Sequence, residues 1–267
     1  MKDQKWLYYK NMRNRINGRK DMANFFNYVT DYPPGNGFEM FGFIHIMWLV
    51  VIVIISIIIS IIYSLLSKQN KEKKMRLCIG IIMPVISLYR DLVLLITGHF
   101  DRFYLPLHLC GMALFIGSIY CFTKWRFVGV IYVLLCVPGA LGALLFPDWI
   151  DYPLWNYMHI HDFISHGLIV AWGICLLASG ELIPKWKELW MPVVFGICGV
   201  GILYPVNNLL GTNYWFLNGP SPGSPLESVF GITGKNLYIP GYIMFVMVLV
   251  IIWMGIIKGL CYLSKKN

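Results

Sequence analysis

Several polar and ionisable residues of this chain lie inside long apolar segments and gather toward one end of them. Such groups are costly in hydrocarbon, so several of them at one depth of a membrane predict a site that faces a cavity. Imidazole and carboxylate groups suit acid–base chemistry, whereas guanidinium and amide groups suit the binding of anions. The set consists of His45, Arg90, Asp91, His108, Asp162, His166, Asn207 and Asn208.

The densest signal lies in the fifth apolar segment, where His159, Asp162 and His166 are spaced i, i+3, i+7. This spacing predicts one shared face of a helix. A carboxylate beside an imidazole can fix its tautomer and raise its basicity, as a general base or a metal ligand requires. His166 and Asp162 are therefore catalytic candidates. The alternative for His159 and His161 is a position in the aqueous loop before the helix starts.

The third apolar segment opens with Leu105-Pro106-Leu107-His108-Leu109-Cys110-Gly111. His108 is the other catalytic candidate, and its alternative is a structural histidine that is hydrogen-bonded to another helix. Gly111 leaves room for the close approach of a substrate or a helix. On a helix, Cys110 would point about 200° away from His108, so we expect it to be a poor nucleophile for the same pocket.

Arg90 lies in the second segment and is predicted to bind substrate, because its planar fork fits a phosphate or a carboxylate. Asp91 is adjacent and should diverge from it by about 100°, toward a different partner. The alternative is an ion pair between helices, with Asp162 as one possible partner of Arg90. His45 is expected to be a hydrogen-bonding residue near the membrane interface.

Amide groups are dense where the sixth segment ends, and four residues there are predicted to bind substrate: Asn207, Asn208, Asn213 and Tyr214. Amides could donate to a headgroup or to a developing oxyanion. The run that follows, 217–226, is rich in Gly and Pro and cannot continue a helix. It predicts a lid over the polar pocket, and the alternative is an ordinary interfacial loop.

These residues must be positioned by membrane helices, because 58% of the chain is hydrophobic and only 13% is charged. A run of about 20 apolar residues can cross the hydrocarbon core. The sequence predicts an all-α polytopic membrane protein, a bundle of about seven transmembrane helices. The expected spans are 42–66, 77–97, 103–122, 126–146, 161–180, 189–210 and 238–263.

Lys and Arg residues concentrate in the loops between spans 1 and 2, 3 and 4, and 5 and 6, and in the C-terminal tail. This distribution predicts an N-terminus outside and a cytoplasmic C-terminus in a multi-pass protein of the cell membrane. Residues 1–24 form a basic arm, which either lies along an anionic membrane surface or is a solvated tail. Residues 25–267 are expected to be a single seven-helix membrane domain.

Other chemistries are not indicated. The seven cysteines include no CxxC pair, so we expect no disulfides. Motifs of serine hydrolases, zinc proteases, P-loop proteins and dinucleotide-binding folds are absent from the sequence. No cofactor, no metal site and no nucleic-acid partner is expected; membrane lipids are the expected partners.

Four motifs resemble the YwaF-like family of bacterial integral membrane proteins: Phe41-Gly42 with His45, Leu105 to Cys110, His166, and Asn208 to Leu217. That family resembles a eukaryotic group of polytopic proteins that includes an ether-phospholipid acyltransferase, and more distantly intramembrane lipid hydrolases that pair Thr or Cys with His. The resemblance implies catalytic roles for His108 and His166. It implies no thioester nucleophile before His108, because Leu107 stands where the acyltransferases carry cysteine.

The leading functional hypothesis is a membrane enzyme that handles acyl chains of lipids or lipid-modified substrates, by acyl transfer or ester hydrolysis, at an outer-leaflet pocket. His166 would be the general base, and Asp162 would orient it. One alternative is a non-catalytic binder or transporter of a small amphiphile. Another is an assembly partner whose polar contacts are only structural.

Overall fold

The computed structural model describes residues 25–32 and 35–266, and among these residues it has helices and no strands. Seven helices are long and apolar enough to cross a membrane, which confirms the all-α bundle expected from the sequence. The basic arm, residues 1–24, lies outside the described residues. The long elements are α2 (Phe43–Lys68), α3 (Lys73–Ile96), α4 (Leu109–Thr123), α5 (Arg126–Ile131), η3 (Tyr132–Cys136), α6 (Val137–Leu145), α7 (Tyr157–Ala178), α8 (Trp190–Leu210) and α9 (Pro225–Lys266).

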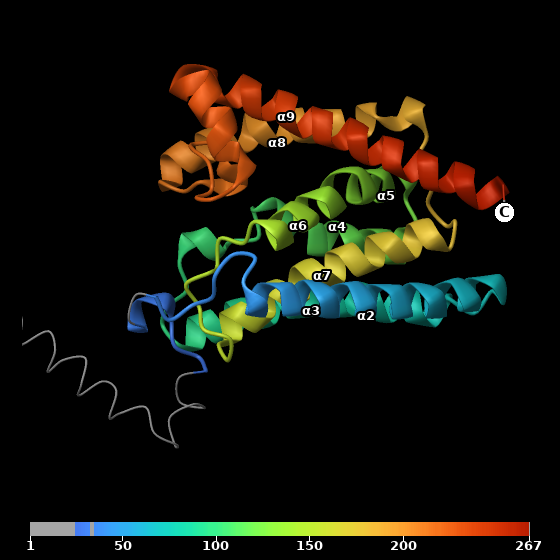
Figure 1. Cartoon of the computed structure of the whole chain (residues 1–267), viewed down its shortest axis with the longest axis horizontal. Helices are drawn as coiled ribbons and strands as arrows, with labels where there is room; N and C mark the ends of the chain where they lie inside the picture. The colour runs from blue at the N-terminus through green and yellow to red at the C-terminus, as the bar shows by residue number, and fades with distance from the viewer. Residues whose placement is uncertain (1–24, 33–34, 267) are drawn as a thin grey trace, which may run out of the picture.

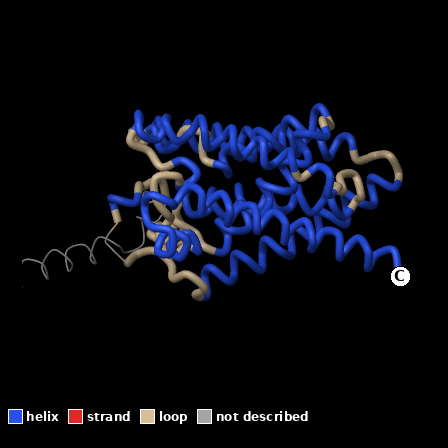
Figure 2. Tube along the Cα trace, turned by 90° about the horizontal axis from the view of Figure 1, so that it is seen from above, coloured by secondary structure: helices blue, strands red, loops and turns tan. Residues whose placement is uncertain are grey.

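The helices form a layered bundle with α7 near its centre. Figure 1 shows α2 and α3 along one side, α8 and α9 along the other, and α4, α5, α6 and α7 between them. Helix α7 packs against α2, α3, α4 and α6, while α9 meets the rest of the bundle at η3 and α6. Figure 2 shows that the loops gather at the two ends of the bundle. The centre of the bundle is therefore α7, which carries the densest polar motif.

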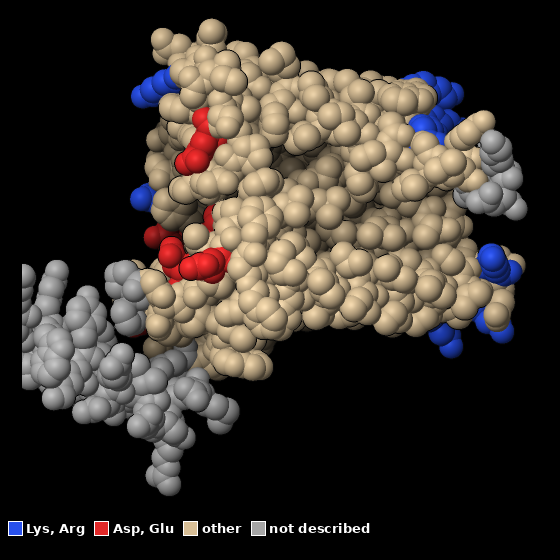
Figure 3. Space-filling view, in the orientation of Figure 1, with Lys and Arg blue, Asp and Glu red and all other residues tan. Residues whose placement is uncertain are grey.

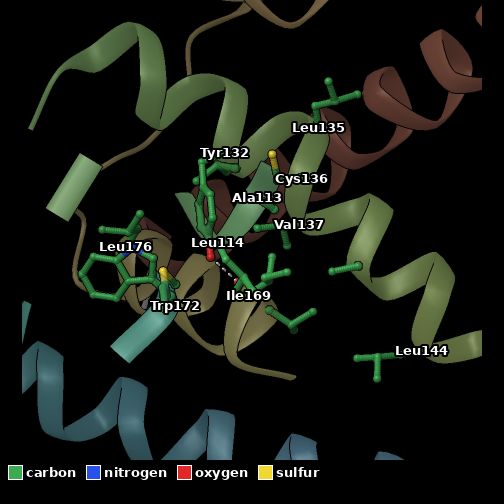
Figure 4. Packing of buried hydrophobic residues seen from close by; sticks show 14 of the residues in the cluster. Ala113, Leu114, Tyr132, Leu135, Cys136, Val137, Leu144, Ile169, Trp172 and Leu176 are labelled. Atoms are coloured by element: carbon green, nitrogen blue, oxygen red, sulfur yellow. Dashed lines mark hydrogen bonds between the residues drawn. The ribbon is translucent and has the colours of Figure 1, made fainter. Parts of the chain in front are cut away.

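Close packing in the middle of the bundle depends on one aromatic hydrogen bond and one glycine. The Tyr132 hydroxyl is buried and donates to the carbonyl of Ile169, at 2.9 Å (Figure 4). A Cβ atom added to Gly173 would lie 2.3 Å from a methyl of Val137, so only glycine lets the two helices approach this closely. These contacts fix α7 against the fourth span.

The fourth span is not a uniform helix, because a π-helical turn, η3, separates α5 from α6. The Val137 amide bonds to the carbonyl of Tyr132, five residues earlier. Pro138 follows and has no N–H to offer the carbonyl of Leu134 in the usual α-helical pattern. A wide turn of this kind accommodates one extra residue within the helix.

Two predicted boundaries differ from the structure. The third span was expected to be helical from 103, but α4 begins at Leu109 because Pro106 pushes the residue before it into an extended conformation. The last helix was expected from 238, but it begins at Pro225 and breaks at Gly234. With φ 64° and ψ 176°, Gly234 adopts a conformation that is open essentially to glycine alone.

A polar network holds the bundle together at the end opposite the polar motif of α7. The Glu181 carboxylate accepts hydrogen bonds from the hydroxyls of Tyr63 (2.6 Å) and Tyr120 (3.2 Å). The ammonium group of Lys124 lies 3.5 Å from the same carboxylate. The network joins α2, α4 and the segment after α7, so these elements are fixed to one another at that end.

Candidate active site

A cavity of about 1000 Å³ opens between the central helices and the pair α8 and α9. The space-filling view shows the molecular surface hollowed between these layers (Figure 3). Most of the wall is apolar and comes from α6, α8 and α9, while polar side chains contribute at one end. The polar lining residues include Arg90, His108, Cys110, Asp148, Asp162 and His166. The arrangement fits a molecule that has a long apolar part and a polar end.

His166 lies on α7 and is oriented by a backbone group. Asn156 starts this helix by accepting hydrogen bonds from the amides of Met158 (2.8 Å) and His159 (3.4 Å). The His166 Nδ1 lies 2.7 Å from the carbonyl oxygen of Asp162. A carbonyl only accepts, so Nδ1 carries the proton, and in the neutral ring Nε2 has a free lone pair. This is the tautomer that a general base needs.

The sequence predicts that the Asp162 carboxylate binds His166, but in the structure it does not. It lies 2.9 Å from Nδ1 of His161, its neighbour in the chain. The i, i+4 spacing instead brings the His166 ring back over the carbonyl of Asp162. The Asp162 carboxylate lines the cavity and interacts with His166 through charge.

Cys110 lines the same cavity as His108, and its thiol interacts with the His166 side chain. The expectation that Cys110 would face away from the pocket is therefore wrong. That expectation assumed that both residues are helical, but His108 is the residue before α4, with an extended backbone (φ −65°, ψ 148°). Only Cys110 lies on the helix, so the 200° divergence does not apply.

The His108 ring is held by aromatic side chains from the segment after α8. Tyr214 meets it edge to face, with ring centroids 5.1 Å apart, and Phe216 lies at 5.8 Å. His108 is close enough to His166 and Arg90 to interact with both through charge. The structure thus brings the two predicted catalytic histidines to one cavity.

Arg90 and Asp91 bind one another rather than different partners. The Asp91 carboxylate accepts hydrogen bonds from Nε (2.9 Å) and Nη2 (2.7 Å) of Arg90. Nη2 also donates to the carbonyl of Tyr104, at 2.6 Å. The prediction of diverging partners is wrong because the arginine side chain is long enough to fold back onto the next residue. Arg90 lines the cavity with most of its charge already paired.

Of the three predicted amide ligands, Asn213 lines the cavity, whereas Asn207 and Asn208 do not. Asn207 is fully buried and makes three hydrogen bonds, to the amide of Tyr214 (2.7 Å), the carbonyl of Tyr214 (2.9 Å) and the hydroxyl of Thr212 (2.9 Å). Asn208 is exposed and does not line the cavity. Asn213 lines the cavity, and its Nδ2 donates to the carbonyl of Gly219 at 2.9 Å.

The Asn207 contacts hold the segment 212–217 in place beside the cavity. Its residues Trp215 and Phe216 have positive φ angles (58° and 56°). The Trp215 ring fits against Gly199 of α8, where an added Cβ would lie 2.2 Å from the indole. Asn213, Trp215 and Phe216 of this segment line the cavity, as do Ser221 and Ser224 after it, whereas Tyr214, predicted to bind substrate, is not among the lining residues.

Two residues of the loop between α6 and α7 were missed by the sequence analysis. Asp148 and Trp149 both line the cavity, and Trp149 stacks on His166 with ring centroids 5.0 Å apart. The signal was available, because Pro147-Asp148-Trp149 follows the fourth span at the end of the bundle where the polar residues gather. A loop position cannot be assigned to a helix face, so the spacing argument did not find it.

Asp148 is an exposed residue that lines the cavity, and the protein around it partly removes its carboxyl group from water. Burial raises its pKa, the Asp162 carboxylate raises it further, and His166 acts in the opposite direction. The charged form is thus disfavoured in the folded protein. Since the pKa is higher in the folded than in the unfolded state, ionisation of Asp148 costs stability at every pH above its ordinary value.

Replacing Asp148 by asparagine should therefore raise the unfolding temperature at pH 7. The gain should shrink as the pH falls toward about 4, where an ordinary aspartate becomes protonated in the unfolded chain too. Thermal unfolding of the detergent-solubilised protein at both pH values measures the effect. Asp151→Asn in the same exposed loop is the control, and an equal gain in both variants would contradict the assignment.

The remaining histidines of the predicted set lie away from the cavity lining. His45 accepts a hydrogen bond from the amide of Phe41 (2.8 Å) and donates to the carbonyl of Leu144 (2.7 Å), which confirms it as a hydrogen-bonding residue. His159 is buried in α7 rather than in an aqueous loop, and it accepts from the indole of Trp48 at 2.8 Å. Among the described residues, no group of three or more His, Cys, Asp or Glu could hold a metal ion.

Comparison with models of known protein families places the chain in a membrane-protein family. The model of the TMEM164 family, a family of membrane proteins, matches residues 40–258. The match covers all seven predicted spans except the last few residues of the seventh. No curated protein and no solved structure matches the chain.

Proposed function

The chain belongs to the TMEM164 family of membrane proteins, and from that premise we propose that it is an enzyme acting on the acyl chains of lipids or lipid-modified substrates. The observation that carries the proposal is that Cys110 and His166 line the polar end of one large apolar cavity and are close enough for their side chains to interact. A thiol beside a basic nitrogen is the arrangement used by cysteine nucleophiles. The motif resemblance to YwaF-like proteins, and through them to an acyltransferase, supports action on acyl chains but not the choice of Cys110, because Leu107 stands where the acyltransferases carry cysteine.

The proposed reaction has two steps. Nε2 of His166 takes the Cys110 proton, and the sulfur attacks the ester carbonyl of the acyl donor. The carbon–oxygen ester bond breaks, and the departing alcohol oxygen takes the proton from the imidazolium, which leaves a thioester on Cys110. An acceptor hydroxyl then gives its proton to His166 and attacks the thioester, and the cysteine sulfur leaves and is reprotonated. With water as the acceptor, the same steps amount to hydrolysis.

The other polar residues of the cavity support this reaction. The Asp162 carboxylate stabilises the imidazolium through charge, and its backbone carbonyl holds the Nδ1 proton. His108 lies near His166 and is the second acid–base group. Arg90, already paired with Asp91, and Asn213 border the space where a headgroup would sit. The apolar wall then holds the acyl chain.

We place this site in the outer leaflet of a bacterial cytoplasmic membrane, with the N-terminus outside. In Figure 3, Lys and Arg side chains gather at the end of the bundle where the C-terminus lies, whereas the other end shows Asp and Glu side chains together with some Lys or Arg. Loops rich in basic residues usually face the cytoplasm, so the end of the bundle that carries the C-terminus is the cytoplasmic end. The opposite end, where α7 begins and where Asp162 and His166 lie, then faces outward.

The proposal is tested with the purified protein in liposomes that contain a diacyl phospholipid and a lysophospholipid. Mass spectrometry of the intact protein should detect an acyl group on the wild type that hydroxylamine removes, and lipid analysis should detect transfer to the lysophospholipid or free fatty acid. Cys110→Ala should lose both signals. Turnover that is unchanged in Cys110→Ala would contradict the thiol route, and bound lipid without any turnover would favour a binder or transporter of an amphiphile.

A further inference from the structure

Trp149 is a buried residue of the cavity wall with an unsatisfied hydrogen-bond donor. Its side chain is 6% exposed, and its ring lies nearly parallel to the His166 imidazole, at an angle of 19°. The indole Nε1 has no hydrogen-bond partner among the residues that the structure describes. Trp149 therefore lines the cavity, stacks on the proposed base and keeps a buried N–H without a partner.

An unpaired buried N–H is unfavourable, because it has lost water without gaining another acceptor. A buried tryptophan usually finds such an acceptor. Trp48 donates to His159 at 2.8 Å, and Trp253 donates to the carbonyl of Val133 at 2.9 Å. The unpaired N–H of Trp149 therefore requires an explanation. A ligand that supplies a hydrogen-bond acceptor would explain it.

Two other indoles share the lack of a partner but lie in different surroundings. Trp172 is packed in the bundle centre and does not line the cavity (Figure 4). Trp215 also lines the cavity, but it belongs to the segment after α8 and packs against Gly199 of that helix. Among these three indoles, Trp149 is the one stacked on His166, and so it is the one close to the reacting groups.

The donors that the sequence analysis assigned to an oxyanion are already engaged. Arg90 binds Asp91 and Tyr104, and the Asn207 side-chain amide is hydrogen-bonded to the carbonyl of Tyr214. The Asn213 amide donates to Gly219. A reaction that places negative charge on a carbonyl oxygen still needs a donor directed at that oxygen.

We propose that the Trp149 indole N–H donates a hydrogen bond to the carbonyl oxygen of the acyl group while Cys110 attacks it. As the carbon–sulfur bond forms, the carbonyl electron pair moves onto the oxygen, and the indole stabilises that charge without giving up its proton. The carbonyl re-forms when the ester alcohol leaves with the proton from His166. This inference rests on the proposed function and adds the donor that function requires.

The test compares two reactions of Cys110 in the full-length protein. Acylation by a phospholipid or an activated ester passes through an oxyanion, whereas alkylation by iodoacetamide does not. Trp149→Phe keeps an aromatic ring on His166 and removes the N–H, so acylation should fall by about 10²–10³. Alkylation should stay within about twofold of wild type, because the thiol and its base are unchanged.

Two further variants separate the N–H from the shape of the ring. Benzothienylalanine at position 149 replaces the N–H by sulfur in a ring of the same form, and it should lose acylation as Trp149→Phe does. Trp155→Phe removes an indole that is 72% exposed in the same loop, and it should behave as wild type.

The outcomes are distinguishable. Normal acylation in the benzothienylalanine protein would overturn this inference alone, as would an equal loss of acylation and alkylation, which indicates only misplacement of His166. Absence of any acyl-cysteine in the wild type would overturn the proposed function and this inference together.

Discussion

Replacing His166 by glutamine should lower lipid turnover by a factor on the order of 10²–10⁴, the contribution of a positioned general base. Glutamine can still donate to the carbonyl of Asp162, so the local hydrogen bond can be kept. It cannot accept the thiol proton of Cys110, so the thiolate is no longer generated. Both thioester formation and its transfer to an acceptor should slow, because His166 acts in each step.

The same substitution at His99 is the matched control for His166→Gln. His99 is partly exposed, stacks on Tyr28 and does not line the cavity. Turnover of a defined phospholipid in liposomes is measured for both variants and the wild type. A His99→Gln protein that loses as much activity as His166→Gln would mean that the effect comes from general damage to the fold. Full activity in His166→Gln would exclude it as the base.

Replacing Asn207 by leucine should destabilise the protein by about 3 kcal/mol or more. The change removes a fully buried side chain with three hydrogen bonds and leaves the polar groups of Tyr214 and Thr212 without partners. Each buried group left unpaired costs about 1–3 kcal/mol. The segment that carries Tyr214 and Phe216 should loosen, and with it the aromatic contacts of His108.

The adjacent residue gives the control for this second experiment. Asn208 is exposed, so Asn208→Leu should leave the free energy of unfolding nearly unchanged. Chemical unfolding in mixed micelles measures the stability of both variants. If the two leucine substitutions had equal effects, the contacts of Asn207 would not be what holds this segment.

The count and the approximate limits of the seven helices could be predicted because uninterrupted apolar length is nearly sufficient to define a membrane span. Placing His108 and His166 at one cavity was also possible, since membrane depth alone brings their ends of the helices together. Depth does not give direction around a helix. For this reason the side-chain partners of Arg90 and Asp162 were predicted incorrectly.

Other features depended on where a helix begins. Cys110 was excluded from the pocket on the assumption that His108 is helical, and the extended backbone before α4 invalidates that step. Asn207 was interpreted as a ligand because an amide in an apolar segment draws attention, whereas its partners are groups only five to seven residues later in the chain. Contacts that depend on a particular loop conformation are not encoded in spacing.

The π-helical turn η3 has a consequence for how the fourth span is compared with other sequences. The extra residue in Tyr132–Cys136 shifts the angular phase of everything after it by about 100°, the rotation per residue of an α-helix. A single helical wheel drawn over Arg126–Leu145 would therefore mix core positions before the turn with cavity positions after it. In an alignment of this span, a relative without the wide turn should show a one-residue gap between the two halves, at no cost to either helical pattern.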